Sequence, residues 1–314
     1  MKIMHGDCSE YLKTIKTESI DCIVTSPPYW QLRDYGVSNQ IGMEESIEEY
    51  IDKLMNIMNE LYRVLKKSGT FFLNLGDTYS NVNSKFYPAN KMKDNKFSWI
   101  EGTVVSRKTN ILRKSKMMIP ERLSIRMIDS GWILRNEIIW HKPNALPESL
   151  TDRFTNDFEK IFFFTKSQKY YFQKQYEPYS EKTLHSFKDG IMPTGKKKML
   201  SAGESKMAMK KIDKPWRAVY NEKGRNMRTV WSIANKGLRE GHYASFPEKL
   251  VERCLLSGCP QNGIVLDPFL GSGTTLKVAK NLNLNGIGIE LKKEYIDIAV
   301  HRIGEDLFTK IQIV

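Results

Sequence analysis

The chain has 314 residues, with 49 Lys or Arg and 36 Asp or Glu, so its formal net charge is +13. A content of 40% hydrophobic and 27% charged residues is typical of a folded globular protein and excludes a disordered or fibrous chain. No run of about 18 apolar residues is present and the N-terminus lacks the apolar stretch of a signal peptide, which argues against a membrane protein and against export. The four cysteines are too few and too scattered for a disulfide framework, so we expect a soluble protein of a reducing cytoplasm.

Strand and helix patterns alternate along most of the chain. Buried-strand patterns cover residues 20–24, 70–75, 133–140, 160–165, 264–266 and 286–290, and helical spacing of apolar residues covers 46–66, 120–130, 247–257, 274–281 and 292–302. We expect the first of these helices to stop at Lys67-Ser68-Gly69, with Gly69 as its C-terminal cap. Nearly continuous apolar strands that alternate with helices predict an α/β fold with a doubly wound, mostly parallel sheet. Such a sheet binds its ligands at the carboxyl ends of the strands.

The positive charge is concentrated in two segments. Residues 80–118 carry a net charge of +7 and residues 166–228 carry +10, which leaves −4 for the core formed by 1–79, 119–165 and 229–314. Both segments interleave aromatic residues with the basic ones, a combination that suits phosphate contact and base stacking. We interpret them as nucleic-acid-binding insertions, with a pair of solvated insertions as the alternative.

One loop has the features of a nucleoside site. Residues 267–275, Asp-Pro-Phe-Leu-Gly-Ser-Gly-Thr-Thr, follow a predicted strand and open a helix. Gly271 and Gly273 allow a tight turn and a close approach of the backbone to a ligand. Asp267 could hold a cationic group, and Glu290, at the end of the next strand, could bind both hydroxyls of a ribose. The alternative interpretation is a tight turn that caps a helix.

A second loop, Thr25-Ser26-Pro27-Pro28-Tyr29-Trp30, follows the strand at 20–24. Two consecutive prolines stiffen the backbone and remove two N–H donors, which leaves carbonyl acceptors for a substrate. The Ser26 hydroxyl adds an acceptor and Tyr29 an aromatic face. This arrangement suits an exocyclic amino group on a flat ring, with a strand-terminating turn as the alternative.

Together these motifs resemble the amino-methylating DNA methyltransferases that use S-adenosylmethionine. The order of Ser26-Pro27-Pro28-Tyr29 before Asp267 to Thr275 is similar to that of the β group of this family. Further similar segments are His5-Gly6-Asp7-Cys8, Ile138 to Asn144 and Ser245 to Leu250. The resemblance implies a Rossmann-like class I methyltransferase fold, with the core as the catalytic part, residues 80–118 as a basic insertion and 166–228 as the target-recognition region.

The resemblance also implies roles for individual residues. A family member flips its target base out of duplex DNA. Tyr29 would stack on that base, and Ser26 and the carbonyl of Pro27, held rigid by Pro28, would accept hydrogen bonds from its amino group. The implied residues for S-adenosylmethionine are Asp7, Phe246, Asp267, Pro268, Phe269, Gly271, Ser272, Gly273, Thr274 and Glu290.

The first residue of the target loop bears on the base that is modified. In this family Ser-Pro-Pro-Tyr is associated more often with N4 of cytosine and Asp-Pro-Pro-Tyr with N6 of adenine, so Ser26 favours cytosine and leaves adenine as the alternative. C5 methylation needs a nucleophilic cysteine in a Pro-Cys context, whereas Cys259 precedes Pro260. We expect no metal ion. An RNA- or protein-directed methyltransferase and a non-catalytic nucleic-acid-binding module remain competing hypotheses.

Contact with double-stranded DNA is assigned to the second basic segment. Arg and Asn side chains suit base edges, whereas Lys suits phosphate. Enzymes of this kind usually protect the DNA of a prokaryotic host beside a separate restriction endonuclease, and we expect a cytoplasmic, nucleoid-associated protein; its oligomeric state is left open. The candidate DNA contacts are Lys196, Lys197, Lys198, Arg217, Arg225, Asn226 and Arg228.

Overall fold

The structure is a computed structural model, and it describes residues 1–32, 34, 36, 40–80, 111–112, 114–181, 184, 221–235, 246–305 and 310–314. The chain divides into two compact units, one formed by Met1–Gln173 with Thr229–Val314 and the other by Lys174–Arg228. Of the predicted basic insertion 80–118, residues 81–110 and 113 lie outside the described residues. The predicted division of the chain into a core and two insertions stays a prediction.

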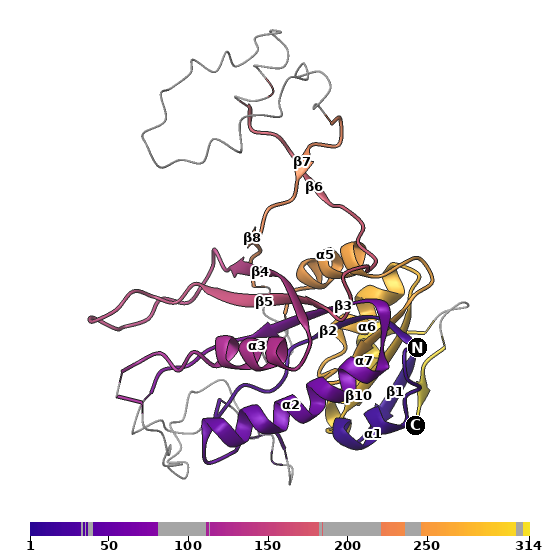
Figure 1. The fold of residues 1–314 in the computed structure, drawn as a ribbon, viewed down its shortest axis with the longest axis horizontal. Helices are drawn as coiled ribbons and strands as arrows, with labels where there is room; N and C mark the ends of the chain where they lie inside the picture. Colours follow the sequence, from indigo (N-terminus) through magenta and orange to yellow (C-terminus); the bar gives the residue numbers. More distant parts are fainter. Residues whose placement is uncertain are drawn as a thin grey trace. The chain divides into compact units, whose positions relative to one another are not determined.

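The larger unit is built on a nine-stranded sheet with the order β11-β1-β10-β9-β2-β3-β5-β4-β8 (Figure 1). Neighbouring strands are parallel throughout, except that β5 runs antiparallel to both β3 and β4. This confirms the predicted mostly parallel sheet. The strands are β1 (Lys2–His5), β2 (Ile20–Thr25), β3 (Leu65–Leu75), β4 (Ile133–His141), β5 (Phe158–Thr165), β8 (Val230–Ser232), β9 (Ile264–Asp267), β10 (Asn285–Glu290) and β11 (Gln312–Ile313).

Helices cover both faces of this sheet, so the fold is doubly wound. Adjacent residues of a strand point to opposite faces, and in β1 Ile3 belongs to one hydrophobic cluster and Met4 to another. The cluster that contains Met4 includes side chains of α1 (Cys8–Thr14), α2 (Ile47–Val64) and α3 (Ile119–Asp129). The cluster that contains Ile3 includes side chains of α6 (Thr274–Asn281) and α7 (Lys293–Ile303), and α5 (Glu248–Gly258) packs beside α6.

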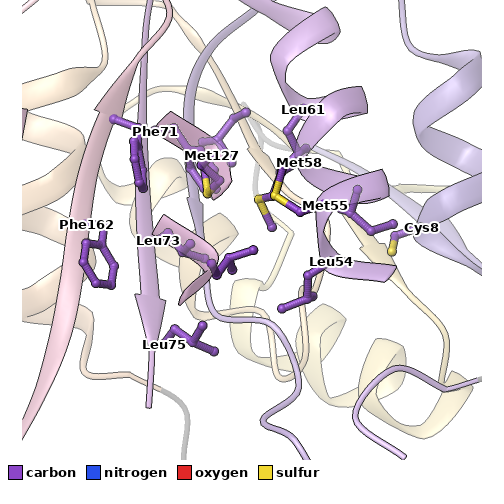
Figure 2. Close-up of a cluster of buried hydrophobic side chains, with 14 of the residues drawn as sticks. Cys8, Leu54, Met55, Met58, Leu61, Phe71, Leu73, Leu75, Met127 and Phe162 are labelled. Carbon is purple, nitrogen blue, oxygen red and sulfur yellow. The ribbon is translucent and has the colours of Figure 1, made fainter. Parts of the chain in front are cut away.

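The main core lies between α2 and the centre of the sheet. Leu54, Met58 and Leu61 follow one another at helical spacing and face Phe71 and Leu73 of β3 (Figure 2). The apolar face of α2 was predicted from this spacing. Burial of each of these side chains contributes about 1.5–3 kcal/mol of transfer free energy, so the core fixes the strand ends that carry the two loops.

Two local predictions were wrong or incomplete. Gly69 is not a helix cap, because α2 already ends at Val64 and β3 begins directly at Leu65, so that Gly69 lies inside the strand. Parallel pairing of β3 with β2, with a register shift after Ile20, extends the strand backwards through polar residues that look like a helix end. The strand β1 and the helix α1 were not predicted, although β1 brings His5 and Gly6 to the carboxyl edge of the sheet.

The smaller unit contains one antiparallel strand pair among its described residues, β6 (Tyr176–Glu177) with β7 (Arg225–Asn226). Residues 185–220 of this unit lie outside the described part of the chain. Of the helices that the structure describes in either unit, none has the length and apolarity to cross a membrane.

Candidate active site at the carboxyl edge of the sheet

The parallel strands bring both predicted loops to one edge of the sheet. The strands β9, β10, β1, β2 and β3 run parallel, so their carboxyl ends meet at this edge. Asp267 ends β9 and Glu290 ends β10, whereas Ser26 directly follows β2. Because β5 runs the other way, it places its first residues, Phe158 and Glu159, at the same edge. The candidate site therefore draws on six strands.

The glycine-rich loop between β9 and α6 has the backbone that its glycines predict. Gly271 and Gly273 have φ angles of +53° and +82°, in the left-handed region that favours glycine. A Cβ at Gly273 would lie 2.7 Å from the Cβ of Ala299, so this glycine is needed for packing against α7. A Cβ at Gly271 would meet only the Phe269 carbonyl, at 4.0 Å, so the backbone there is open to a ligand.

Helix α6 starts directly behind this loop. Gly273 is its N-cap residue, and no side chain caps the helix. The positive end of the helix dipole, together with first-turn N–H groups, favours a ligand carboxylate at this point. The predicted contact of this loop with the methionine end of S-adenosylmethionine stays a prediction.

Asp267 is 1% exposed and accepts hydrogen bonds from the protein with both of its oxygens. The hydroxyls of Thr25 and Thr275 each donate at 2.6 Å, and the backbone N–H of Phe269 donates at 3.1 Å. Burial raises the pKa of this carboxyl to about 6, although these three donors favour the charged form. Asp267 thus joins the target loop, through Thr25, to the glycine-rich loop and to α6. Its predicted contact with the cofactor stays a prediction.

Glu290 is largely buried beside the same loop. Its Oε2 accepts from the Gly271 N–H and its Oε1 from the Lys292 N–H, both at 2.8 Å. Burial raises the pKa of Glu290, and the same two N–H groups act against that shift. The carboxylate is therefore oriented before any ligand arrives, as a ribose-binding group requires.

Of the other predicted cofactor residues, Asp7 lies beside the end of β10, and Phe246 precedes α5. Gly6 donates its N–H to the Glu290 carbonyl at 2.9 Å, and Asp7 accepts from the Ser9 N–H at 2.8 Å and caps α1. Phe246 is 9% exposed and lies just before α5. The strand ends and helix starts thus gather Asp7 and Glu290 at neighbouring positions of the edge.

The sequence did not point to Arg302, which supports the glycine-rich loop from α7. Its Nη1 donates to the Ser272 carbonyl at 2.7 Å and to the Thr274 hydroxyl at 3.1 Å, and it also bonds the Ser272 hydroxyl. Arg302 also lies beside Glu248 at the start of α5, with 3.7 Å between Nη2 and Oε1. No local motif marks this arginine, because its partners lie 28 or more residues away in the chain.

The target loop is anchored on its far side. The Tyr50 hydroxyl of α2 donates to the Pro28 carbonyl at 2.7 Å, and the buried Trp30 donates its indole N–H to the Glu44 carbonyl at 2.9 Å. Within the part of the chain that the structure describes, no donor reaches the carbonyl of Pro27. Pro27 therefore offers an acceptor on a backbone that is already fixed.

A network of polar side chains, not predicted from the sequence, surrounds Tyr29. The Tyr29 hydroxyl donates to Glu159 Oε2 at 2.7 Å, and the Asn74 amide donates to the same oxygen at 3.1 Å. Lys142 binds Oε1 of the same carboxylate and lies over the Trp140 ring, 4.5 Å from its centroid. Burial, followed by the charge of Glu159, raises the pKa of Tyr29 well above its ordinary value. Tyr29 thus keeps its proton and acts as a hydrogen-bond donor.

The four cysteines lie buried in the core, away from a nucleophilic role. Burial raises the pKa of the Cys8 and Cys259 thiols to about 12, so they carry almost no thiolate at neutral pH. This argues against a covalent cysteine mechanism. Among the described residues, no three His, Cys, Asp or Glu side chains gather in a way that would hold a metal ion.

The candidate DNA-binding residues are only partly described. Lys196, Lys197, Lys198 and Arg217 lie outside the described residues. In the smaller unit, Arg225 and Arg228 both donate to Glu177 Oε1, at 2.8 and 2.6 Å, and Asn226 pairs with Tyr176 across the two strands. The shared carboxylate gathers two guanidinium groups beside the β6–β7 strand pair, and their contact with DNA stays a prediction.

Comparison with known proteins identifies the family of the chain. Residues 20–301 match the family model for N6/N4 methyltransferases, described as DNA methylase. The chain is 35% identical over 309 residues to the type II methyltransferase M.Cfr9I of Citrobacter freundii, covering 97% of this chain and 88% of that protein. It is 37% identical to M.SmaI of Serratia marcescens over 303 residues, covering 96% and 90%.

Solved structures show the same fold at lower identity. The PvuII DNA methyltransferase (cytosine-N4-specific) superposes with a TM-score of 0.61 at 20% identity and covers 97% of this chain and 86% of its own. The complex of M1.HpyAVI with S-adenosylmethionine gives a TM-score of 0.52 at 18% identity, covering 97% and 100%. S-adenosylmethionine is the methyl donor, and the chain belongs to the N6/N4 family of DNA methylases and is a DNA methyltransferase.

Proposed function

We propose that this DNA methyltransferase methylates the exocyclic N4 of a cytosine flipped out of duplex DNA. The observation that carries the proposal is the link from Thr25 through Asp267 to Thr275, which joins the target loop to the glycine-rich loop at distances of 2.6 Å. A substrate amino group held by Ser26 and Pro27 would then lie beside a cofactor held by the second loop. Fixing both reactants on one frame is a large source of rate enhancement.

The residues of the target loop suit the chemistry of an aromatic amino group. The lone pair of such a nitrogen is delocalised into the ring, which makes it a poor nucleophile. The Ser26 hydroxyl and the Pro27 carbonyl accept from its two hydrogens and favour a more tetrahedral nitrogen, and they also stabilise the positive charge that develops there. Stacking on Tyr29 holds the ring in place. When bound, S-adenosylmethionine supplies a methyl group activated by its sulfonium charge.

Cytosine is favoured over adenine by the first residue of the target loop. Ser26 is an uncharged acceptor of the kind associated with N4 methylation, and the structural neighbour PvuII methyltransferase is named as cytosine-N4-specific. The alternative, methylation of adenine N6, uses the same acceptors on a similar amino group. Mass analysis of nucleosides from DNA methylated in vitro separates the two, and N6-methyladenine as the product would refute the cytosine assignment.

Duplex DNA as the substrate is supported by the excess of positive charge in residues 166–228 and by the family. We infer that the target-recognition residues lie in this segment, and that the protein is the modification half of a type II restriction–modification system, as its relatives are named. A separate nuclease would then cut DNA that lacks the methyl group.

Transfer of labelled methyl groups to duplex DNA, RNA and protein tests the substrate class directly. We expect incorporation into duplex DNA alone. Incorporation into RNA would favour the RNA-directed alternative, and no incorporation into any acceptor would favour a non-catalytic binding module. Sequencing of DNA from cells that express the chain would then give the modified base, its position and its recognition sequence.

A further inference from the structure

Two hydroxyls and a carboxylate form a directional chain beside the target loop. The Ser26 hydroxyl donates to the Tyr29 hydroxyl at 3.5 Å, and the Tyr29 hydroxyl donates to Glu159 Oε2 at 2.7 Å. Each hydroxyl has one hydrogen and an ionised carboxylate has none, so the direction of donation is set from the Glu159 end. The Ser26–Tyr29 contact is long, as catalytic hydrogen bonds often are before a substrate binds.

This direction decides what Ser26 can do. Its single hydrogen points to Tyr29, so its lone pairs remain for the hydrogens of a substrate amino group. Without Glu159, the Tyr29 hydroxyl could donate to Ser26, and Ser26 could then turn its own hydrogen towards the substrate. The carboxylate therefore keeps Ser26 an acceptor.

The surroundings hold Glu159 and Tyr29 in place. Lys142 and Asn74 bind the Glu159 carboxylate, whose side chain is 17% exposed. The ring of Tyr29 lies against the backbone of Gly76, where a Cβ would approach within 2.4 Å of it. Glu159 and Tyr29 are thus fixed before a substrate arrives, and the high pKa of Tyr29 means that it passes a proton on rather than losing its own.

Methylation of an amino group produces a proton that must leave. The nitrogen loses conjugation with the ring as it bonds to the methyl group, so the cationic product is a strong acid. Resting on the proposed function, we propose that Glu159 takes up this proton through Tyr29 and Ser26. The proton passes from the nitrogen to Ser26 Oγ, the Ser26 hydrogen passes to Tyr29 Oη, and the Tyr29 hydrogen passes to Glu159 Oε2. The products are a neutral methylamino group, two intact hydroxyls and a protonated carboxyl.

The hydrogen-bonded chain from Ser26 to Glu159 also stabilises the transition state. Positive charge builds up on the nitrogen as the methyl group moves, and acceptors polarised by a carboxylate counteract it. A positioned proton acceptor contributes about 10²-fold to 10⁴-fold to the rate of a reaction step. Glu159 should therefore affect the rate of transfer much more than the binding of either substrate.

Two isosteric variants test this chain. Glu159→Gln keeps an acceptor for the Tyr29 hydroxyl but cannot take up a proton, and Tyr29→Phe keeps the ring but removes the relay. We expect each to lower the single-turnover rate about 10²-fold or more, with the affinities for S-adenosylmethionine and duplex DNA unchanged. Because both act on one path, the double variant should be no slower than the slower single variant.

Glu121→Gln is a matched control. Glu121 is also a partly buried carboxylate bound to a lysine, Lys160, but it lies in the first turn of α3 outside the target loop. Its variant should transfer methyl groups at the wild-type rate, and thermal unfolding of all variants shows whether they are folded.

The proposed proton path is refuted if either single variant stays within threefold of the wild-type rate. Multiplicative losses in the double variant would also overturn it, since they indicate two independent roles. The proposed function is tested separately, because it depends on whether wild-type protein methylates duplex DNA at all. The proton path is tested by the ratio of the variant's single-turnover rate to that of the wild type.

Discussion

The two loops at the carboxyl edge differ in how many of their hydrogen-bonding groups have partners within the protein. In the glycine-rich loop, the Gly271 N–H donates to Glu290 and the Ser272 carbonyl accepts from Arg302, so side chains of the protein hold the loop backbone. In the target loop, the Pro27 carbonyl meets no donor among the described residues, and Ser26 makes one long contact. We infer that the protein fixes the backbone of the first loop before a cofactor binds and leaves the uncapped start of α6 for the ligand. In the target loop the described residues leave acceptors open for a substrate.

Removal of the Tyr29 side chain should have the largest effect on this comparison. Tyr29→Ala loses base stacking, worth about 1–3 kcal/mol, and the proton path, worth about 10²-fold or more. We expect methyl transfer to fall by at least about 10³-fold, with S-adenosylmethionine affinity unchanged. Single-turnover transfer and calorimetric titration measure the two.

Tyr62→Ala serves as the control, because Tyr62 lies in the last turn of α2, just before β3 begins, and packs edge-on against Trp132. It should leave the transfer rate near the wild-type value. A Tyr29→Ala variant that binds the cofactor ten times more weakly would show that the loops are not separable in this way.

Truncation of Glu290 should act on the other loop. Glu290→Ala removes two backbone hydrogen bonds, from Gly271 and Lys292, together with the predicted ribose contact. We expect S-adenosylmethionine to bind roughly 10-fold to 100-fold more weakly, since hydrogen bonds to a charged group contribute about 1.5–3 kcal/mol. The exposed Glu294 in the first turn of α7 gives the control, Glu294→Ala. Unchanged affinity in Glu290→Ala would refute the ribose role.

Asp267 accepts hydrogen bonds from residues of both loops, and its titration tests this link between them. Its folded pKa of about 6 lies above the ordinary value of 3.8, so the folded state binds a proton more tightly than the unfolded state. Its contribution is therefore most favourable below pH 4 and is lost as the pH rises through 6. The loss should be roughly 2–3 kcal/mol, because one pKa unit corresponds to about 1.4 kcal/mol.

Asp267→Asn removes this titration. Urea unfolding at pH 4 and pH 7 should show that the stability of wild type relative to Asp267→Asn decreases as the pH rises. A difference that does not change with pH would mean that Asp267 does not titrate in this range. It would then be a permanently charged acceptor for Thr25 and Thr275.

The parts of the site that could be predicted lie at the ends of strands. Asp267 and Glu290 stand where apolar strand patterns stop, and a parallel sheet brings such positions to the same edge whatever the order of its strands. Glu159 could not be predicted in the same way. It meets Tyr29 across 130 residues only because β5 is antiparallel and sits beside β3.

The sequence also could not predict the contact of Thr25 with Asp267, which spans 242 residues, or that of Arg302 with Ser272. A local pattern indicates which edge a residue reaches, whereas strand order decides which side chain it meets. Gly69 shows the reverse failure. A polar stretch with a glycine has the composition of a helix end, but pairing with β2 draws it into a strand.

The smallest expected effect concerns DNA binding by residues of the smaller unit, outside the two loops. Arg228 is 68% exposed and shares Glu177 with Arg225, and its positive charge suits a phosphate or a base edge. Arg228→Ala should weaken duplex binding several-fold and lower the salt dependence of log K by about 1, because one phosphate contact is lost. Arg126→Ala, on α3 and paired with Asp52, is the control and should leave both unchanged. If Arg228 instead reads a base, its loss should relax sequence preference with little change in the salt slope, which assigns it to recognition rather than to backbone contact.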